Sequence, residues 1–309
     1  MTLLVVNPKS GGGKTEALFP GMRPAIEKAL GEVEIAFTKR TGHGIALAEE
    51  GAKAGHTLVV AVGGDGTFNE VVNGLMRAGK AGVEVGIIGQ GTGGDFRKSV
   101  GLEHRLDAYL AALAKGDTRA LDVARCSYRG RNGEAEERWV ANIVSCGIGG
   151  LVDQYVATST RAFGGTAAYF GAGLRALVNG RLGRLSVRVT SGGETREHKL
   201  QTYLLAVCNG RYFGSGMMVA PMADIGDGKL EIVSMGPRSK LAFAVTQSAI
   251  YKGEHLQHPD AVHLAGQKVE IMLDNDDAKE RFLIDLDGEP VGGLPMTVEI
   301  VPGALRLRA

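Results

Sequence analysis

The stretch LVVAVGGDGTFNEVVNGL, residues 58–75, decides the fold of the first part of this chain. Residues 58–62 form an uninterrupted apolar run typical of a buried strand, and residues 68–75 carry apolar side chains at helical spacing. The turn between them reads Gly63-Gly64-Asp65-Gly66-Thr67. A strand, a glycine turn and a helix in this order bring backbone N–H groups and the positive end of a helix into one concavity, which suits a phosphate group.

The position of Asp65 inside this turn indicates a cation as well. A carboxylate beside a phosphate cradle repels the phosphate unless a cation lies between them. The turn therefore predicts a metal-bound nucleotide. The alternative is a tight strand-to-helix turn without a ligand, for which four of the five residues are poor choices.

Composition limits the classes of protein that need to be considered. A chain of 309 residues is long enough for two domains, and 44% apolar and 22% charged residues are typical of a globular protein. The 35 basic and 34 acidic residues nearly cancel, which argues against a nucleic-acid partner held by bulk electrostatics. Three widely spaced cysteines, Cys126, Cys146 and Cys208, predict neither a disulfide framework nor a zinc site and favour a reducing compartment.

The beginning of the chain and its apolar runs bear on location. The first residues enter a strand-like run at once, without the basic, apolar and small-residue succession of a signal peptide. No apolar stretch approaches the roughly 18 residues of a membrane span. We therefore expect a cytoplasmic protein that is able to associate transiently with the inner face of a membrane.

Residues 1–124 alternate short apolar strands with helices. This pattern predicts a parallel sheet covered on both faces, which binds ligands at the carboxyl ends of its strands. Three glycine-rich turns, after the first, third and fourth strands, fall at that edge. The expected strands are residues 3–6, 33–37, 58–62 and 83–88, and the expected helices include residues 16–30, 44–54 and 106–114.

Residues 125–298 consist mainly of strands separated by turn clusters, which predicts an antiparallel β-sandwich. One helical stretch, residues 162–178, carries an apolar stripe with arginines nearby. It is open to two interpretations, packing against a sheet or docking on an anionic membrane. The expected strands are residues 138–146, 185–190, 202–208, 229–234, 268–273, 282–286 and 296–301.

Two further glycine motifs imitate better-known ones. Residues 8–15, PKSGGGKT, end like a P-loop, but Pro8 stands where a P-loop has its leading glycine. Residues 89–94, GQGTGG, spell the dinucleotide fingerprint but follow the fourth strand rather than the first. Neither a P-loop ATPase nor a hydride-transfer enzyme is favoured.

Taken in chain order, the motifs resemble the diacylglycerol-kinase catalytic family, which includes bacterial lipid kinases, sphingosine kinases and ceramide kinases. The glycine turn with its central Asp also occurs in NAD kinases and phosphofructokinases, whereas the opening and closing motifs distinguish the lipid kinases. The resemblance rests on NPKSG at 7–11 with Lys14, GGDGTFNE at 63–70, Gly91-Thr92 with Asp95-Phe96, Asn209-Gly210 with Gly214 and Gly216, residues 221–228, and DGEP at 287–290.

The resemblance implies an NAD-kinase-like or lipid-kinase-like α/β domain, a β-sandwich for the acceptor, and an active site in the cleft between them. The last segment, residues 299–309, is expected to return to the first domain. The implied activity is ATP-dependent phosphorylation of a lipid hydroxyl, on diacylglycerol or a sphingoid or ceramide-type acceptor at a membrane surface, with Mg²⁺. The alternatives are a kinase for NAD or another soluble acceptor and a non-catalytic nucleotide- or lipid-binding module. A homodimer is left open.

The family pattern also implies roles for individual residues. Glu289 is the expected proton acceptor with Asp287 beside it, and Asp65 and Asp95 are expected to hold the catalytic Mg²⁺. For Asp287, a hairpin turn with Gly288 is the alternative. The expected nucleotide-binding residues are Asn7, Ser10, Gly11, Thr38, Gly63, Gly64, Gly66, Thr67, Asn69, Glu70 and Thr92.

Two positions leave questions open. Asp224, Asp227 and Lys229 match the stretch where family members hold a second, structural metal ion, and an Asp-rich turn before a strand is the alternative. Gly94 stands where most members carry Asn immediately before the Asp, here Asp95. This departure leaves the identity of the acceptor open but not the prediction of a kinase.

Overall fold

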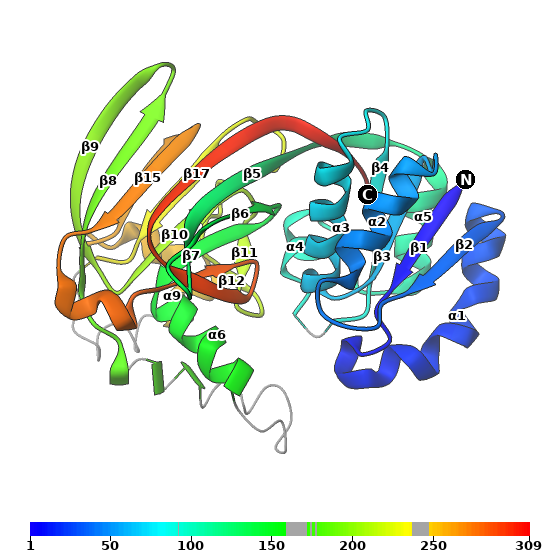
Figure 1. Ribbon diagram of the computed structural model, residues 1–309, viewed down its shortest axis with the longest axis horizontal. Coiled ribbons are helices and arrows are strands. Elements are labelled where there is room, and N and C mark those ends of the chain that lie inside the picture. Colours follow the sequence, from blue (N-terminus) through cyan, green and yellow to red (C-terminus); the bar gives the residue numbers. More distant parts are fainter. Residues whose placement is uncertain (92, 159–171, 174, 177, 237–246) are drawn as a thin grey trace.

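The computed structural model describes residues 1–91, 93–158, 172–173, 175–176, 178–236 and 247–309. Figure 1 shows an α/β part and a β-rich part joined by two long strands that arch between them side by side. These strands are β5 (Thr118–Gly130) and β17 (Glu289–Arg308), which pair antiparallel along most of their length.

The α/β part is built on a parallel sheet with the strand order β4-β3-β1-β2. Its strands are apolar because both faces are covered by helices. The bounds are β1 (Thr2–Val6), β2 (Val33–Phe37), β3 (Leu58–Gly63), β4 (Glu84–Gly89), η1 (Ser10–Gly13), α1 (Lys14–Leu30), α2 (His43–Lys53), α3 (Asp65–Ala78), α4 (Asp95–Ser99) and α5 (Leu106–Lys115).

The alternation of side chains along β1 shows how the helices divide between the two faces. Leu3 and Val5 belong to one buried cluster together with side chains of α2 and α3. Leu4 and Val6 belong to another, together with side chains of α1 and α5. The sheet is therefore the middle layer of three, and sheets of this kind bind ligands at their carboxyl edge.

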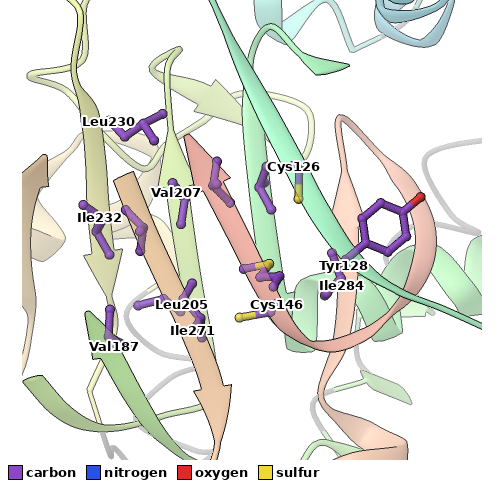
Figure 2. Close-up of a cluster of buried hydrophobic side chains, with 14 of the residues drawn as sticks. Cys126, Tyr128, Cys146, Val187, Leu205, Val207, Leu230, Ile232, Ile271 and Ile284 are labelled. Carbon is purple, nitrogen blue, oxygen red and sulfur yellow. The ribbon is translucent and has the colours of Figure 1, made fainter. Parts of the chain in front are cut away.

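The second part is an antiparallel sandwich with strand orders β14-β13-β10-β7-β16-β17 and β9-β8-β15-β17-β5-β6. Figure 2 shows side chains from both layers, such as Val207 of β10 and Ile271 of β15, meeting in one buried cluster. The bounds are β6 (Ala135–Val140), β7 (Ile143–Gly147), β8 (Gly183–Ser191), β9 (Glu194–Thr202), β10 (Leu204–Cys208), β11 (Tyr212–Phe213), β12 (Met217–Met218), β13 (Leu230–Ser234), β14 (Val262–Gly266), β15 (Lys268–Leu273), β16 (Leu283–Leu286), α6 (Ile148–Thr158), α9 (Gln247–Tyr251), η3 (Glu254–Gln257) and η4 (Asp276–Arg281).

The predicted fold class, an α/β domain with a parallel sheet followed by a β-sandwich, is confirmed. The two domains share strands: residues 306–308 of β17 pair parallel with β4 of the first domain. β5 likewise runs through the boundary expected at residue 124, so the domains are joined by continuous strands rather than by a loop.

The structure differs from the sequence prediction in several places. The strand expected at residues 138–146 is two strands, because the chain bends at Asn142, whose carbonyl accepts the N–H groups of Asn209 and Gly210 at 2.9 Å each. Strands β5, β9, β11, β12 and β14 and helix α6 were not predicted. Most of the helix expected at residues 162–178 lies outside the described residues, and its docking on a membrane stays a hypothesis. No helix in the described part of the chain is long and apolar enough to cross a membrane.

Candidate active site

The glycine turn after β3 is fixed to the end of β1. Gly63 ends β3, Gly64 is the extended residue before α3, and Asp65 is the first residue of the helix. Asn7, which follows β1, donates from Nδ2 to Oγ1 of Thr67 at 3.1 Å. Two predicted nucleotide-binding side chains therefore contact each other at the carboxyl edge of the sheet, and a Cβ on Gly66 would meet nothing within 4 Å, so that position faces open space.

The turns after β3 and β4 approach so closely that they require glycine. A Cβ on Gly91 would lie 2.8 Å from Cα of Gly64, closer than real Cβ atoms come to backbone. Gly11 has φ +61, and its Cβ would lie 2.7 Å from the carbonyl oxygen of Gln90. The three glycine-rich turns therefore meet at one place, while Thr92, next to Gly91, lies outside the described residues.

Ser10 and Thr38 lie at the same edge. The hydroxyl of Ser10 donates to the carbonyl of Asn7 at 2.9 Å and lies 2.7 Å from Oγ1 of Thr15, so it shapes the loop after β1. Thr38 follows β2, is buried, and donates its N–H to Val6 at 2.9 Å. Both predicted residues therefore border the site.

Asp65 and Asp95 come together from the turns after β3 and β4. The carboxylate of Asp65 accepts the N–H groups of Asp95 and Phe96, each at 3.2 Å. A Cβ on Gly93 would lie 3.4 Å from Oδ2 of Asp65 and 3.9 Å from Oδ2 of Asp95, so both carboxylates face the same small space. Burial raises the pKa of Asp65, and the negative charge of Asp95 raises it further.

This pair fits a divalent cation, because a cation between the carboxylates would relieve their repulsion. Within the described residues no group of three His, Cys, Asp or Glu side chains is placed to hold a metal ion. A cation here would therefore take its remaining ligands from phosphate oxygens and water, as Mg²⁺ commonly does. Lys98 supplies a positive charge at the same place, with Nζ 3.2 Å from Oδ1 of Asp95.

Asp287 connects the glycine turn to the sandwich. Its Oδ2 accepts a hydrogen bond from Nδ2 of Asn69 on α3 at 2.6 Å, and its Oδ1 accepts the N–H of Ile143 at 2.8 Å. The N–H of Ala141 adds a longer bond of 3.3 Å. Asp287 has φ +49 in the turn between β16 and β17, so it is a turn residue whose carboxylate also joins the two domains.

Burial raises the pKa of Asp287 to about 6, and the negative charge of Asp65 adds to the shift. The three N–H donors favour the ionised form of the carboxyl group and therefore oppose this rise in its pKa. Asn69 lies one turn after Asp65 on α3, so its hydrogen bond to Asp287 brings the β16–β17 hairpin close to the predicted metal-binding residues.

Glu289 begins β17, two residues after Asp287. Its Oε2 lies 2.6 Å from Nη1 of Arg138 on β6, and both side chains are partly exposed. The ion pair orients the carboxylate, and its exposure leaves it accessible to a substrate. Arg138 was not among the predicted site residues.

Glu70 is placed differently from the rest of its motif. Its two carboxylate oxygens accept the N–H groups of Gly42 at 2.7 Å and Gly44 at 2.8 Å, where α2 begins. Both oxygens are therefore used to cap a helix that has no side-chain cap of its own. The geometry gives Glu70 a role in holding α2, and its part in nucleotide binding stays a prediction.

The loop of Asp224, Asp227 and Lys229 forms two side-chain turns. Asp224 accepts the N–H of Gly226 at 3.1 Å, and Asp227 accepts the N–H of Lys229 at 3.0 Å. The described residues bring no third acidic side chain to either one. A structural metal ion at this loop stays a prediction.

Asp122 is a buried residue that the sequence analysis missed. Its carboxylate accepts the N–H of Gly228, in the loop just described, at 2.6 Å and the N–H of Gly303 at 2.7 Å. An acidic residue between apolar neighbours in a strand is the sequence signal that could have identified Asp122 as a buried carboxylate. Asp122 holds this loop and the returning part of β17 against β5.

A pocket of ≈ 340 Å³ lies beside the glycine turns, on the side of α1 and α5. In its wall, Nδ1 of His104 lies 2.9 Å from the hydroxyl of Tyr109. Burial lowers the pKa of His104, and the charge of Arg97 adds to the effect. Gly11 was predicted as a nucleotide-binding residue, whereas His104 and Tyr109 were not, because their spacing is that of an ordinary helix start. The pocket is lined by Gly11, Lys14, Thr15, Leu18, Gly89, Gln90, Gly91, His104, Arg105, Leu106 and Tyr109.

The geometry agrees with what comparisons with known families show. Residues 1–126 match the diacylglycerol kinase catalytic domain, and residues 142–309 match the YegS C-terminal NAD kinase beta sandwich-like domain. The chain belongs to the diacylglycerol-kinase catalytic family. This confirms the resemblance found in the motifs.

Individual relatives cover nearly the whole chain. It is 29% identical over 312 residues to lipid kinase YegS of Escherichia coli (strain K12), covering 99% of this chain and 95% of that protein. A solved structure described as a "putative diacylglycerol kinase" from Bacillus anthracis str. Sterne superimposes with a TM-score of 0.76 at 24% identity, over 99% of this chain and 94% of the other. Yeast NADH kinase gives a TM-score of 0.50 at 11% identity, over 99% of this chain and 82% of the other. The two solved structures support the fold.

Proposed function

We propose that this protein is an ATP-dependent kinase that transfers the γ-phosphoryl group to a hydroxyl group of a membrane lipid, of the diacylglycerol, sphingoid or ceramide type. Membership of a family of lipid kinases supports the reaction class. The observation that carries the proposal is the hydrogen bond of 2.6 Å between Asn69 and Asp287. It brings the helix of the phosphate turn against the hairpin that carries Glu289, so that donor and acceptor groups share one site.

The nucleotide side of the site provides charge neutralisation and positioning, which is most of what phosphoryl transfer requires. Backbone N–H groups at Gly64 and Gly66 and the hydroxyl of Thr67 would bind phosphate oxygens. Asp65 and Asp95 would hold Mg²⁺, which supplies neutralisation of the charge on the transferred group. Lys14 lines the pocket next to the turn and would reach the phosphates from the other side.

The acceptor side provides a base. Glu289 would accept the proton of the lipid hydroxyl, and Arg138 would keep its carboxylate in one orientation. Asp287 would act as a positioning residue, because its carboxylate is occupied by donors from both domains. The enzyme would work in the cytoplasm and meet its substrate by transient association with the inner face of a membrane.

The test is transfer of label from [γ-³²P]ATP with Mg²⁺ to a panel of lipids in mixed micelles: diacylglycerol, ceramide, sphingosine and phosphatidylglycerol. NAD in plain buffer is the parallel acceptor. We expect label in one or more lipids and none in NAD, with Asp65→Asn inactive and Asp276→Asn, an exposed carboxylate of the same chain, fully active. Label in NAD with no labelled lipid would overturn the proposal.

A further inference from the structure

A second pocket, of ≈ 530 Å³, lies on the sandwich domain and away from the glycine turns. Its volume is within the range of small-molecule sites. Segments far apart in the sequence form it: the β5–β6 hairpin, α6, η4 and the β16–β17 hairpin. It is lined by Arg129, Gly130, Arg131, Gly133, Gln154, Lys279, Leu283, Ile284, Pro290, Val291, Gly292, Gly293, Leu294 and Pro295.

One part of this lining is apolar. Leu283 and Ile284 come from β16, and Val291 and Leu294 come from β17. Leu283, Val291 and Leu294 are only partly buried, so they keep apolar surface in contact with water. Covering such surface with a hydrocarbon chain is favourable in proportion to the area removed from water.

The other part of the lining is cationic. Arg129, Arg131 and Lys279 are exposed, and no Asp or Glu joins them among the described residues of the lining. The two guanidinium groups donate to backbone carbonyls, Arg129 to Gly133 at 3.1 Å and Arg131 to Pro290 at 2.9 Å. These bonds hold the side chains at the pocket without neutralising them. The lining is therefore positive, although the whole chain has a formal net charge of only +1.

We infer that this pocket binds one anionic phospholipid molecule, with an acyl chain against Leu283, Val291 and Leu294 and the phosphate against Arg129, Arg131 and Lys279. A neutral lipid would leave the three positive charges without a partner. A small anion such as inorganic phosphate would leave the apolar wall in water. An amphiphile with a negative headgroup satisfies both parts of the lining.

The place of the pocket gives this binding a consequence. Pro290 lines the pocket and directly follows Glu289 in β17. A bilayer lipid held here keeps the β16–β17 hairpin, and with it Glu289, at the membrane surface. That consequence for catalysis rests on the proposed lipid kinase activity, whereas the binding itself does not.

The first experiment measures co-sedimentation of the full chain with phosphatidylcholine vesicles, with and without phosphatidylserine. The test variant is R129Q/R131Q/K279Q, and the matched control is K28Q/R77Q/K80Q, which removes the same charge from exposed positions of the first domain. Each Lys or Arg at an anionic surface contributes about fivefold in affinity. We expect the test variant to bind anionic vesicles on the order of a hundredfold more weakly than the control variant, and K279Q alone about fivefold. An equal loss of vesicle binding in both triple variants would mean that only the overall charge of the protein matters, and it would overturn the inference.

The second experiment separates a lipid from a free anion or an acidic protein segment. Calorimetric titration uses dihexanoyl phosphatidylserine below its micelle concentration, with glycerophosphoserine, dihexanoyl phosphatidylcholine and a poly-glutamate peptide in parallel. We expect saturable binding of the first compound, about tenfold weaker binding to Leu294→Asn, and no binding of the other three. Equal binding of glycerophosphoserine or poly-glutamate would overturn the inference. Thermal unfolding of each variant checks its fold. Neither experiment requires kinase activity, so the lipid-binding inference can fail or succeed independently of the proposed kinase reaction.

Discussion

The contact between the two domains depends on Asp287, and replacing it by Asn tests that dependence. The carboxylate accepts hydrogen bonds from Asn69 at 2.6 Å, Ile143 at 2.8 Å and Ala141 at 3.3 Å. A carboxamide has one acceptor oxygen, and its NH₂ group would face N–H donors. If the oxygen keeps the bond from Ile143, the donors of Asn69 and Ala141 lose their acceptor.

The size of the effect follows from those two donors. A buried donor left without an acceptor costs about 1–3 kcal/mol. Asn69 keeps a second bond, to the carbonyl of Trp139 at 3.2 Å, which puts its loss at the low end. We therefore expect Asp287→Asn to lower the free energy of unfolding by about 2–4 kcal/mol at neutral pH.

The same variant has a defined pH dependence. The pKa of Asp287 is raised from 3.8 to about 6 in the folded protein, so the stability that its protonation contributes is full below 3.8 and is lost as pH rises through about 6. A shift of this size corresponds to at most about 3 kcal/mol. The stability difference between the wild type and Asp287→Asn should therefore be larger near pH 4 than near pH 7, and the subtraction cancels groups common to both proteins.

Urea unfolding followed by circular dichroism at several pH values measures both quantities. Asp276→Asn, an exposed carboxylate of the same domain, is the control and should change stability by less than about 0.5 kcal/mol. If Asp287→Asn unfolds at the same urea concentration as the wild type at every pH, the reasoning about this contact is refuted.

Three further variants test other parts of the site. Gly91→Ala forces its Cβ to 2.8 Å from Gly64, so ATP-dependent transfer should fall about a hundredfold with the fold intact by circular dichroism; normal transfer would contradict the close approach. Arg138→Met removes the ion pair of Glu289 and should slow transfer about two- to fivefold at unchanged ATP affinity by calorimetry, whereas weaker ATP binding would place the pair elsewhere. Asp227→Ala should lower the free energy of unfolding by about 1 kcal/mol if the loop is only a turn. A larger destabilisation, seen as a lower melting temperature and reproduced by adding a chelator to the wild type, would indicate a bound cation.

The sequence was sufficient for the fold class and for the position of the three glycine turns at one edge of the sheet, because both depend on local rules. Buried parallel strands read as apolar runs, and the three glycine turns have residues that only a close backbone approach requires. At Gly91 and Gly64 the structure shows that approach directly. β9 was missed for the converse reason, since most of its residues are exposed and polar and give no apolar pattern.

Contacts between distant segments could not be predicted in this way. Asn69 and Asp287 are 218 positions apart, and no periodicity relates them. Glu70 shows a second difficulty: a sequence motif alone does not say toward which side of a helix each of its side chains points. On α3 a residue four positions after Asp65 lies about 40° around the axis and one five positions after lies about 140° around it. Asn69 therefore stays on the side of the site, whereas Glu70 points to α2.

Single-turnover transfer from the preformed [γ-³²P]ATP–Mg²⁺ complex to lipid, in the wild type and in Glu289→Gln, tests the central claim most directly. If Glu289 is the base for a lipid hydroxyl, the variant should label lipid about 10² to 10⁴ times more slowly. Its ATP affinity should equal that of the wild type, because the proposed nucleotide site lies on the first domain. Labelled lipid formed at the wild-type rate, or a loss explained entirely by weaker ATP binding, would contradict the account.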